Sequence, residues 1–474
     1  MHRGCREKVR CPHHVARTGR VMAPTTGQER RPGAGGSGVA VGGAAWFMLY
    51  LLVAVTPLMI AVLADPPPGR DLWTEISVGL GFVGLSMLGL QFAVVSRFSA
   101  VNAPFGLDAV LQYHREISYV AMAFVLAHPV IIFVRRPEML EVLNVVEADW
   151  QARFGVLSVA ALLALVATSV WRRPLRLRYE VWRVLHGILA TVVVIAALLH
   201  IEQVGYYVDG PWKRTLWAVM SLAFVALLAN VYLIQPLRIR RRPWRVTSVT
   251  PANGSAWTVE LSPVGHDGIR FVPGQFAWLT FGRSPFAVRE HPFSIASSAE
   301  EPGSVQFAIS EAGDFTSRIG ELEPGTRAYL DGPYGVFSYE RQEGPRFVFV
   351  AGGIGIAPVL SMLRTLADRG DSRPCLLLLG NPSLEAAPYR QEVEELGDRL
   401  DLTVVHVLDD PPQGWEGETG FIDGDVLDRH LGEGFERARY FLCGPVPMTD
   451  AVQAALAERG VPTDHVNLEL FELV

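Results

Sequence analysis

The chain has 474 residues, of which 50% are hydrophobic and only 19% are charged, and its formal net charge is -6 at pH 7. This composition is too apolar for an ordinary soluble protein, and the modest negative charge gives no reason to expect a nucleic-acid partner. The length suits about three domains. Four scattered cysteines (Cys5, Cys11, Cys375 and Cys443) suggest no disulfide framework.

The first 43 residues form a distinct segment that is rich in arginine, glycine and proline. Such a composition buries little apolar surface, so residues 1–43 are predicted to be a disordered basic arm. The arm is too long and too basic before the first apolar run to be a secretory signal. Met22 offers an alternative translation start.

Six apolar segments of membrane-spanning length follow the arm. Together they predict an all-α transmembrane bundle over residues 44–236, with membrane lipid as its partner. The predicted spans are Ala44–Leu63, Leu72–Val95, Gln112–Val134, Phe154–Trp171, Glu180–Ile201 and Leu216–Ile234.

Positive charge is concentrated on one side of the predicted bundle. Because cytoplasmic loops are enriched in Lys and Arg, both termini are predicted to lie in the cytoplasm and the protein in the cell membrane. The arginines concerned are Arg172, Arg173, Arg176, Arg178 and Arg183 after the fourth span, and Arg238, Arg240, Arg241, Arg242 and Arg245 after the sixth.

The third and fifth spans each contain two histidines that are 14 residues apart: His114 and His128 in one, His186 and His200 in the other. Fourteen residues rise about 21 Å along a helix. They fall roughly 40° short of four full turns, so both histidines of a span share one face. Since a bilayer core is about 30 Å thick, one histidine lies toward each leaflet.

These two spans run in the same direction, because the fourth span returns the chain. His114 is therefore expected to face His186 near the cytoplasmic side, and His128 to face His200 near the outer side. Bis-histidine ligation is an established way to hold haem, so each pair predicts a haem site. Buried hydrogen-bonding or proton-relay histidines are the alternative, and zinc is less suited because it prefers four ligands.

The pattern changes after Arg245 to short alternating strands with Gly and Pro turns, as in VQFAIS. Such a pattern predicts an antiparallel β-barrel over residues 240–341. Further strand-like runs then alternate with helical ones, which predicts a parallel α/β domain over residues 345–474.

A glycine-rich turn opens this last domain. Phe347–Val350 is predicted to be a buried strand, and Gly352, Gly353 and Gly355 follow it before a helix with Pro358 near its first position. Strand, glycine turn and helix place backbone N–H groups around a phosphate. The spacing differs from the Rossmann fingerprint, so this signal is weak by itself.

Several motifs in a fixed order resemble those of one known superfamily. They are the histidine pairs, YEVWRVLH, PGQF, HPFS, GGIGIAP and CGPVPM, spread over roughly residues 44–474. The whole chain resembles the ferric reductase and NADPH oxidase superfamily, and its soluble half resembles ferredoxin–NADP reductase-like flavoproteins. The resemblance implies a six-span domain with two haem b groups, a barrel that binds FAD and an α/β domain that binds NAD(P)H.

The resemblance also implies roles for residues of the barrel. His291 takes a place often filled by an arginine near the flavin phosphates, Phe293 would lie against the isoalloxazine, and Ser294 would hydrogen-bond its reactive edge. Thr316 would sit near the pyrophosphate. Further FAD contacts implied by these motifs are Arg289, Pro292 and Gly313.

In the α/β domain, the resemblance implies that Cys443 borders the nicotinamide, with an inert buried thiol as the alternative. Phe471 is a candidate for the C-terminal aromatic ring that shields the flavin, with core packing as the alternative. Ser294, Cys443 and Phe471 are thus the candidate catalytic residues. The implied contacts with the dinucleotide are Gly352, Gly353, Gly355, Pro358, Cys443, Gly444 and Pro445.

Two departures from the family pattern bear on function. Relatives that prefer NADPH often have a basic residue after the strand matching CLLLLG, where this chain has Asn381 and Pro382, so both NADH and NADPH stay open. Eukaryotic superoxide-producing members have a further histidine one turn after the outer ligand of the third span, where this chain has Ile132.

The implied reaction carries electrons from cytoplasmic NAD(P)H through FAD and two haems to a small-molecule acceptor on the outer face. A ferric chelate is the expected acceptor, and an oxidase that makes superoxide or peroxide from O2 is the alternative. A six-span transporter with a nucleotide-sensing domain is a third hypothesis, but it leaves HPFS and CGPVPM unexplained. The sequence indicates no particular partner subunit.

Overall fold

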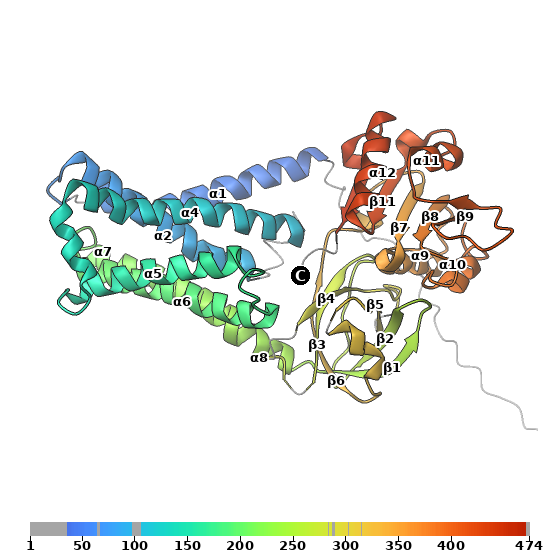
Figure 1. The fold of residues 1–474 in the computed structure, drawn as a ribbon, viewed down its shortest axis with the longest axis horizontal. Helices are drawn as coiled ribbons and strands as arrows, with labels where there is room; N and C mark the ends of the chain where they lie inside the picture. The colour runs from blue at the N-terminus through green and yellow to red at the C-terminus, as the bar shows by residue number, and fades with distance from the viewer. Residues whose placement is uncertain are drawn as a thin grey trace, which may run out of the picture. The chain divides into compact units, whose positions relative to one another are not determined.

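The computed structural model describes residues 36–63, 67–96, 106–282, 284–286, 290–301, 303–313 and 315–470. Along the chain, a helical bundle is followed by an antiparallel sheet and then by a parallel sheet with helices on both faces (Figure 1). The predicted fold class is confirmed. The arm up to residue 35, Arg289 and Phe471 lie outside the described residues.

Six helices in the described part of the chain are long and apolar enough to cross a membrane, as predicted. Some begin earlier than expected: α1 starts at Gly36 rather than Ala44, and α7 starts at Pro211 rather than Leu216. Proline suits the first helical turn, so α7 extends past its apolar stretch. The helices are α1 (Gly36–Leu63), α2 (Leu72–Val95), α4 (Leu107–Arg135), α5 (Trp150–Val170), α6 (Tyr179–Val204) and α7 (Pro211–Ala229), continued by a π-helical turn (Asn230–Ile234) and α8 (Gln235–Arg240).

Helix packing in the bundle is organised in two antiparallel pairs, α2 with α4 and α5 with α6. Glycine lets the first pair approach closely: a Cβ on Gly84 would lie 2.8 Å from a methyl group of Val125. Many large apolar side chains point away from these contacts and are exposed, among them Leu52 and Leu222. Exposed apolar side chains on spanning helices are expected where the surroundings are lipid.

The middle domain is a six-stranded antiparallel sheet with the order β4-β3-β6-β1-β2-β5. An isolated bridge between Ile295 and Phe307 brings its two edge strands together at one point. Buried side chains such as Trp244, Leu261 and Phe307 fill its interior. The strands are β1 (Trp244–Pro251), β2 (Ala256–Pro263), β3 (Phe276–Phe281), β4 (His291–Ser294), β5 (Val305–Ser310) and β6 (Arg327–Tyr334).

The last domain is a parallel sheet with the order β10-β9-β8-β7-β11-β12. Phe347 and Phe349 of β7 pack on the α9 and α10 face, while Val348 and Val350 pack on the α11 and α12 face. The strand order reverses between β7 and β11, and ligands of such sheets bind at the carboxyl ends of the strands there. The elements are β7 (Phe347–Gly352), α9 (Ile356–Asp368), β8 (Cys375–Asn381), α10 (Arg390–Leu396), β9 (Leu402–Leu408), β10 (Glu418–Thr419), α11 (Gly424–His430), β11 (Arg439–Cys443), α12 (Val446–Glu458) and β12 (Val466–Glu469).

His406 on β9 makes the stability of this domain depend on pH. Its side chain is largely buried, neither ring nitrogen is hydrogen-bonded within the described residues, and the Glu394 carboxylate lies 3.8 Å away. Burial lowers the pKa of His406 below its ordinary value of 6.5 despite that carboxylate. Protonation therefore destabilises the fold: the stability that depends on neutral His406 is complete above pH 6.5 and is lost as the pH falls below it.

We expect His406→Leu to remove this acid sensitivity. Amide hydrogen exchange in β9 should be slower in the variant than in the wild type near pH 5.5, and the difference should shrink near pH 7.5. Comparing the two proteins at the same pH cancels the intrinsic pH dependence of exchange. An equal difference at both pH values would contradict the assignment.

Candidate functional site

The four histidines of the bundle lie in two facing pairs. His114 on α4 faces His186 on α6, and His128 faces His200 further along the same two helices. The ring centroids are 6.4 Å apart in both pairs, and the ring planes are inclined by 68° and 64°. The structure thus brings together the residues that the equal spacing paired.

The separation within each pair fits one metal ion between two imidazoles. Metal–nitrogen bonds of about 2.0–2.1 Å on both sides place the ring centroids roughly 6 Å apart. No group of three or more His, Cys, Asp and Glu side chains that could hold a metal occurs in the described part of the chain. A tetrahedral zinc site therefore lacks ligands here, whereas haem supplies its own equatorial nitrogens and needs only the axial pair.

Helix α2 supplies hydrogen-bond partners for both histidines of α4. The Nδ1 atom of His114 lies 2.7 Å from Gln91 Oε1. The Nδ1 atom of His128 lies 2.9 Å from the Ser77 hydroxyl and 3.1 Å from the Ser77 carbonyl oxygen. Ser77 and Gln91 are themselves 14 residues apart, so the antiparallel packing of α2 on α4 matches one polar residue to each histidine.

Helix α5 does the same for the histidines of α6. The Nδ1 atom of His200 lies 2.7 Å from the Gln151 carbonyl oxygen, and that of His186 lies 3.2 Å from the Ser169 hydroxyl. A carbonyl oxygen can only accept, so Nδ1 of His128 and of His200 carries the proton. The lone pair is then on Nε2, which is the atom available to a metal.

None of the four Nε2 atoms has a hydrogen-bond partner among the described residues. Glycine also leaves room beside the second pair: a Cβ on Gly81 would lie 3.3 Å from the His128 ring, and one on Gly155 would lie 3.0 Å from His200 Nδ1. The residues present therefore fit a bis-histidine haem at each level.

Ser77, Gln91, Gln151 and Ser169 were not singled out from the sequence. The 14-residue spacing of Ser77 and Gln91 in an apolar span was a signal that could have identified two of them. Gln151 acts through its backbone, so its side chain gives no such signal.

Strand β4 contains the HPFS motif. Ser294 is only 3% exposed, and its hydroxyl oxygen is buried without a hydrogen-bond partner among the described residues. Such a buried hydroxyl is costly unless a further group completes it, so it fits a bound polar ring edge such as that of a flavin. His291 and Phe293 are half-buried on the same strand, with Pro292 between them.

Phe315, which sequence analysis did not single out, joins these side chains into an aromatic cluster. Its ring stacks on His291 at 4.2 Å between centroids and lies nearly parallel to Phe293 at 6.3 Å. Next to it, the Thr316 hydroxyl accepts hydrogen bonds from the backbone N–H groups of Ala312 (2.9 Å) and Gly313 (3.0 Å). Thr316 therefore shapes this turn, at the first residue of a short 3-10 helix (Thr316–Glu321).

The glycine turn after β7 is packed directly against the turn after β11. A Cβ on Gly355 would lie 2.1 Å from the carbonyl oxygen of Cys443, and one on Gly444 would lie 2.9 Å from the backbone nitrogen of Gly352. Gly352 faces Pro445 in the same way, at 2.7 Å. Both turns lie at the carboxyl ends of β7 and β11, where the strand order reverses and where ligands of such sheets bind.

The positions of Pro358 and Cys443 bear on the roles expected of these two residues. Pro358 is the third residue of α9 rather than its first, because Gly353–Gly355 forms a preceding 3-10 turn. The Cys443 side chain is fully buried in the core that also contains Phe349 and Phe441. That burial favours the alternative of a packed thiol for the side chain, while its backbone carbonyl contacts the glycine turn.

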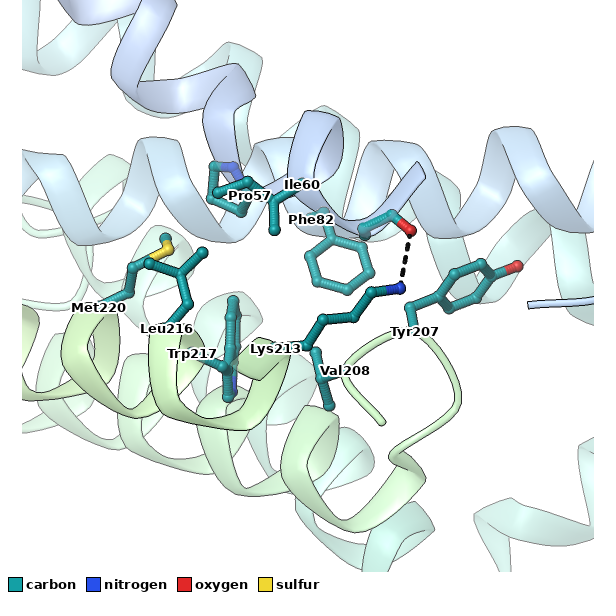
Figure 2. A pocket seen from close by; sticks show the side chains of 10 residues that line it. Pro57, Ile60, Phe82, Tyr207, Val208, Lys213, Leu216, Trp217 and Met220 are labelled. Atoms are coloured by element: carbon teal, nitrogen blue, oxygen red, sulfur yellow. Dashed lines mark hydrogen bonds between the residues drawn. The ribbon is translucent and has the colours of Figure 1, made fainter. Parts of the chain in front are cut away.

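A small pocket between α1, α2 and α7 does not add a ligand site (Figure 2). Its cavity volume is about 20 Å³, which is room for about one water molecule. Lys213 points into it and approaches the Ala61 carbonyl oxygen at 3.5 Å. Apolar side chains dominate the rest of the lining, including Pro57, Ile60, Phe82, Leu216 and Trp217.

Three family models match successive parts of the chain. The ferric reductase like transmembrane component matches residues 80–197, an FAD-binding domain matches residues 247–338, and the oxidoreductase NAD-binding domain matches residues 349–454. The first match contains His114, His128 and His186, and ends three residues before His200.

The relatives share the soluble half. The reductase component of propane 2-monooxygenase from Rhodococcus jostii (strain RHA1) is 33% identical over 236 residues, which are 48% of this chain and 62% of the relative. NADH-cytochrome b5 reductase 2 from Mycosarcoma maydis is 26% identical over 175 residues, 36% of this chain and 50% of the relative. The chain spans about half to two thirds of the length of these curated relatives. A solved ferredoxin reductase in carbazole 1,9a-dioxygenase is 25% identical, with a TM-score of 0.43 over 48% of this chain and 69% of that chain.

Six spanning helices joined to FAD-binding and NAD-binding domains define a transmembrane, NAD(P)H-dependent oxidoreductase, which is an integral membrane protein. The order of the three matched domains is that of the ferric reductase and NADPH oxidase type, and the chain has this architecture.

Because the turns after β7 and β11 are in direct contact, one added methyl group at Gly355 is expected to disturb both. Gly355→Ala should push the turns apart, destabilise the last domain by about 1–3 kcal/mol and raise KM for the dinucleotide. Gly432→Ala is the matched control, because its Cβ would meet only one side-chain atom, at 3.9 Å. Thermal unfolding and steady-state kinetics of both variants test this, and equal behaviour of the two would refute the contact.

Proposed function

We propose that the protein passes electrons from cytoplasmic NAD(P)H through FAD and two haems to an acceptor on the outer face of the membrane. The observation that carries the proposal is the repeated histidine geometry: two pairs at 6.4 Å, with Nδ1 of every ring engaged. When bound, FAD supplies hydride acceptance and single-electron release, and haem iron supplies one-electron carriage.

The chain's own residues would hold each group in place. His114 and His186 would hold the haem near the cytoplasmic side, and His128 and His200 the haem near the outer side. With two imidazoles holding each haem, no position on the metal would be open to an acceptor, which would instead react at the haem edge. The polar partners on α2 and α5 would keep the rings oriented and the Nε2 atoms unprotonated.

In the soluble half, the Ser294 hydroxyl would complete its hydrogen bonding on the flavin edge, and the aromatic side chains of Phe293 and Phe315 would border the ring. The turn Gly352–Gly355 would accept the dinucleotide phosphates on backbone N–H groups. The roles of Arg289 as an FAD contact and of Phe471 as flavin shield, with core packing as the alternative for Phe471, stay predictions, because both residues lie outside the described part of the chain.

The orientation follows from charge. The arginine-rich loops support a cytoplasmic location for both termini and both soluble domains. Electrons would then leave at the opposite face, where His128 and His200 lie. A ferric chelate is the acceptor we favour over O2, because α4 has Ile132 one turn after His128, where superoxide-producing relatives have a histidine.

An optical spectrum of the purified protein in detergent tests the haem assignment. We expect low-spin haem bands that sharpen on NADH addition, with two haems per chain in the wild type. His128→Ala/His200→Ala should lose one of the two haems, whereas His465→Ala, outside the bundle, should lose none. Flavin without haem after haem-replete expression would sink the proposal.

The acceptor is tested by comparing two reactions of the same preparation. We expect NADH oxidation without oxygen to depend on an added ferric chelate such as ferric citrate, and O2 consumption without added iron to be slow. The His128→Ala/His200→Ala variant should lose ferric chelate reduction. Rapid O2 consumption with superoxide formation in the absence of iron would instead establish the oxidase.

A further inference from the structure

An ion pair links the helix that bears the inner histidine to the strand that bears the flavin motif. Nη2 of Arg183 on α6 donates to Oε2 of Glu290, and the two side chains are 35% and 15% exposed. Arg183 lies about one turn before His186. Glu290 directly precedes His291 at the start of β4. The pair therefore links a residue one turn from a candidate inner haem ligand to the residue next to the candidate FAD motif.

Two further contacts join the same surfaces. Leu111, one turn before His114 on α4, packs against Phe276 and Trp278 of β3, the strand that pairs with β4. Nε2 of Gln235 on α8 donates to Oδ2 of Asp331 on β6 at 2.8 Å. Contacts from both histidine-bearing helices and from α8 thus converge on neighbouring strands β4, β3 and β6.

The energetics of the pair favour a positioning role over a stabilising one. Withdrawing a carboxylate and a guanidinium from water costs free energy that their attraction often only offsets. Nη1 of Arg183 is also buried and has no hydrogen-bond partner among the described residues, which adds to that cost. Apolar side chains of similar size would hold the surfaces together as well, but they would fix the orientation less sharply.

We propose that the Arg183–Glu290 pair positions the FAD-binding sheet against the inner haem site and so sets the rate of electron transfer between them. This inference rests on the proposed function. With both groups bound, each transfer would oxidise the reduced flavin by one electron and reduce one haem iron from ferric to ferrous. Hydride transfer from NADH to FAD would not require the pair, because neither Arg183 nor Glu290 is among the residues expected to contact the dinucleotide.

Stopped-flow spectroscopy separates the two steps. In Glu290→Gln and in Arg183→Gln, haem reduction by NADH should slow about tenfold, as expected for losing a partly buried pair. Flavin reduction, and NADH-dependent ferricyanide reduction by the flavin, should stay unchanged. Arg178→Gln is the matched control: it removes a charge near the start of the same helix, from an exposed contact with Glu180 at 3.8 Å.

Charge reversal provides a second test of the pair. The doubly substituted protein with Arg183→Glu and Glu290→Arg should recover haem reduction relative to either single reversal. Haem content and flavin content of every variant should equal those of the wild type.

The outcomes distinguish the failure of this inference from that of the proposed function. Normal haem reduction in Glu290→Gln, or an equal slowing of flavin and haem reduction, would overturn the positioning role. Absence of haem from the wild type would overturn the proposed function itself, before any variant is compared.

Discussion

Hydrogen bonds between neighbouring helices and the four histidine rings are the constraint on which the membrane domain depends. A polar ring inside an apolar span is costly unless its nitrogens are satisfied. Ser77 and Gln91 on α2, and Gln151 and Ser169 on α5, satisfy Nδ1 of each ring. Among the described residues, Nε2 is thus the unsatisfied nitrogen of each ring. The same hydrogen bonds fix the register of α2 on α4 and of α5 on α6. Ring orientation and helix packing are therefore a single property of the fold, and both levels reach the same 6.4 Å separation.

A comparable coupling operates in the soluble half. The glycine turn after β7 is positioned by the backbone of the turn after β11, since Gly355 leaves no room for a side chain against Cys443. The two turns meet because the strand order reverses between β7 and β11. On the antiparallel sheet, the stacking of Phe315 on His291 ties the HPFS strand to the loop that follows β5. In both domains, segments far apart in the sequence are held together by direct packing at the candidate cofactor surfaces.

The features that follow from periodicity could be predicted from the sequence. Fourteen-residue spacing predicts which face of a helix the histidines share, and alternating strands predict an antiparallel sheet. Features that arise from contacts between distant segments could not be predicted from the sequence. The Gln151 carbonyl has no side-chain signature, and Phe315 acts only because β4 lies beside its loop. The Thr316 hydroxyl, expected near the pyrophosphate, accepts hydrogen bonds from the backbone N–H groups of Ala312 and Gly313, and this turn contact could not be read from the sequence. Helix ends such as Pro211 also lie outside the apolar pattern that defined the spans.

If the proposed function holds, the similarity of the two histidine levels has a consequence for the direction of electron flow. Ring separation, ring inclination and the presence of a polar partner on every Nδ1 are nearly the same at both levels. The ligand geometry alone therefore gives an electron no strong preference for either level.

Direction must then come from the ends of the path, where the molecule is asymmetric. At one end Arg183, Leu111 and Gln235 meet the FAD-binding sheet. The other end has no folded domain following it along the chain, because α4 and α6 are joined there to the next helices by short connections. Under the proposed function, the donor would be fixed by protein contacts, and the acceptor would be selected by its access to the outer histidine pair.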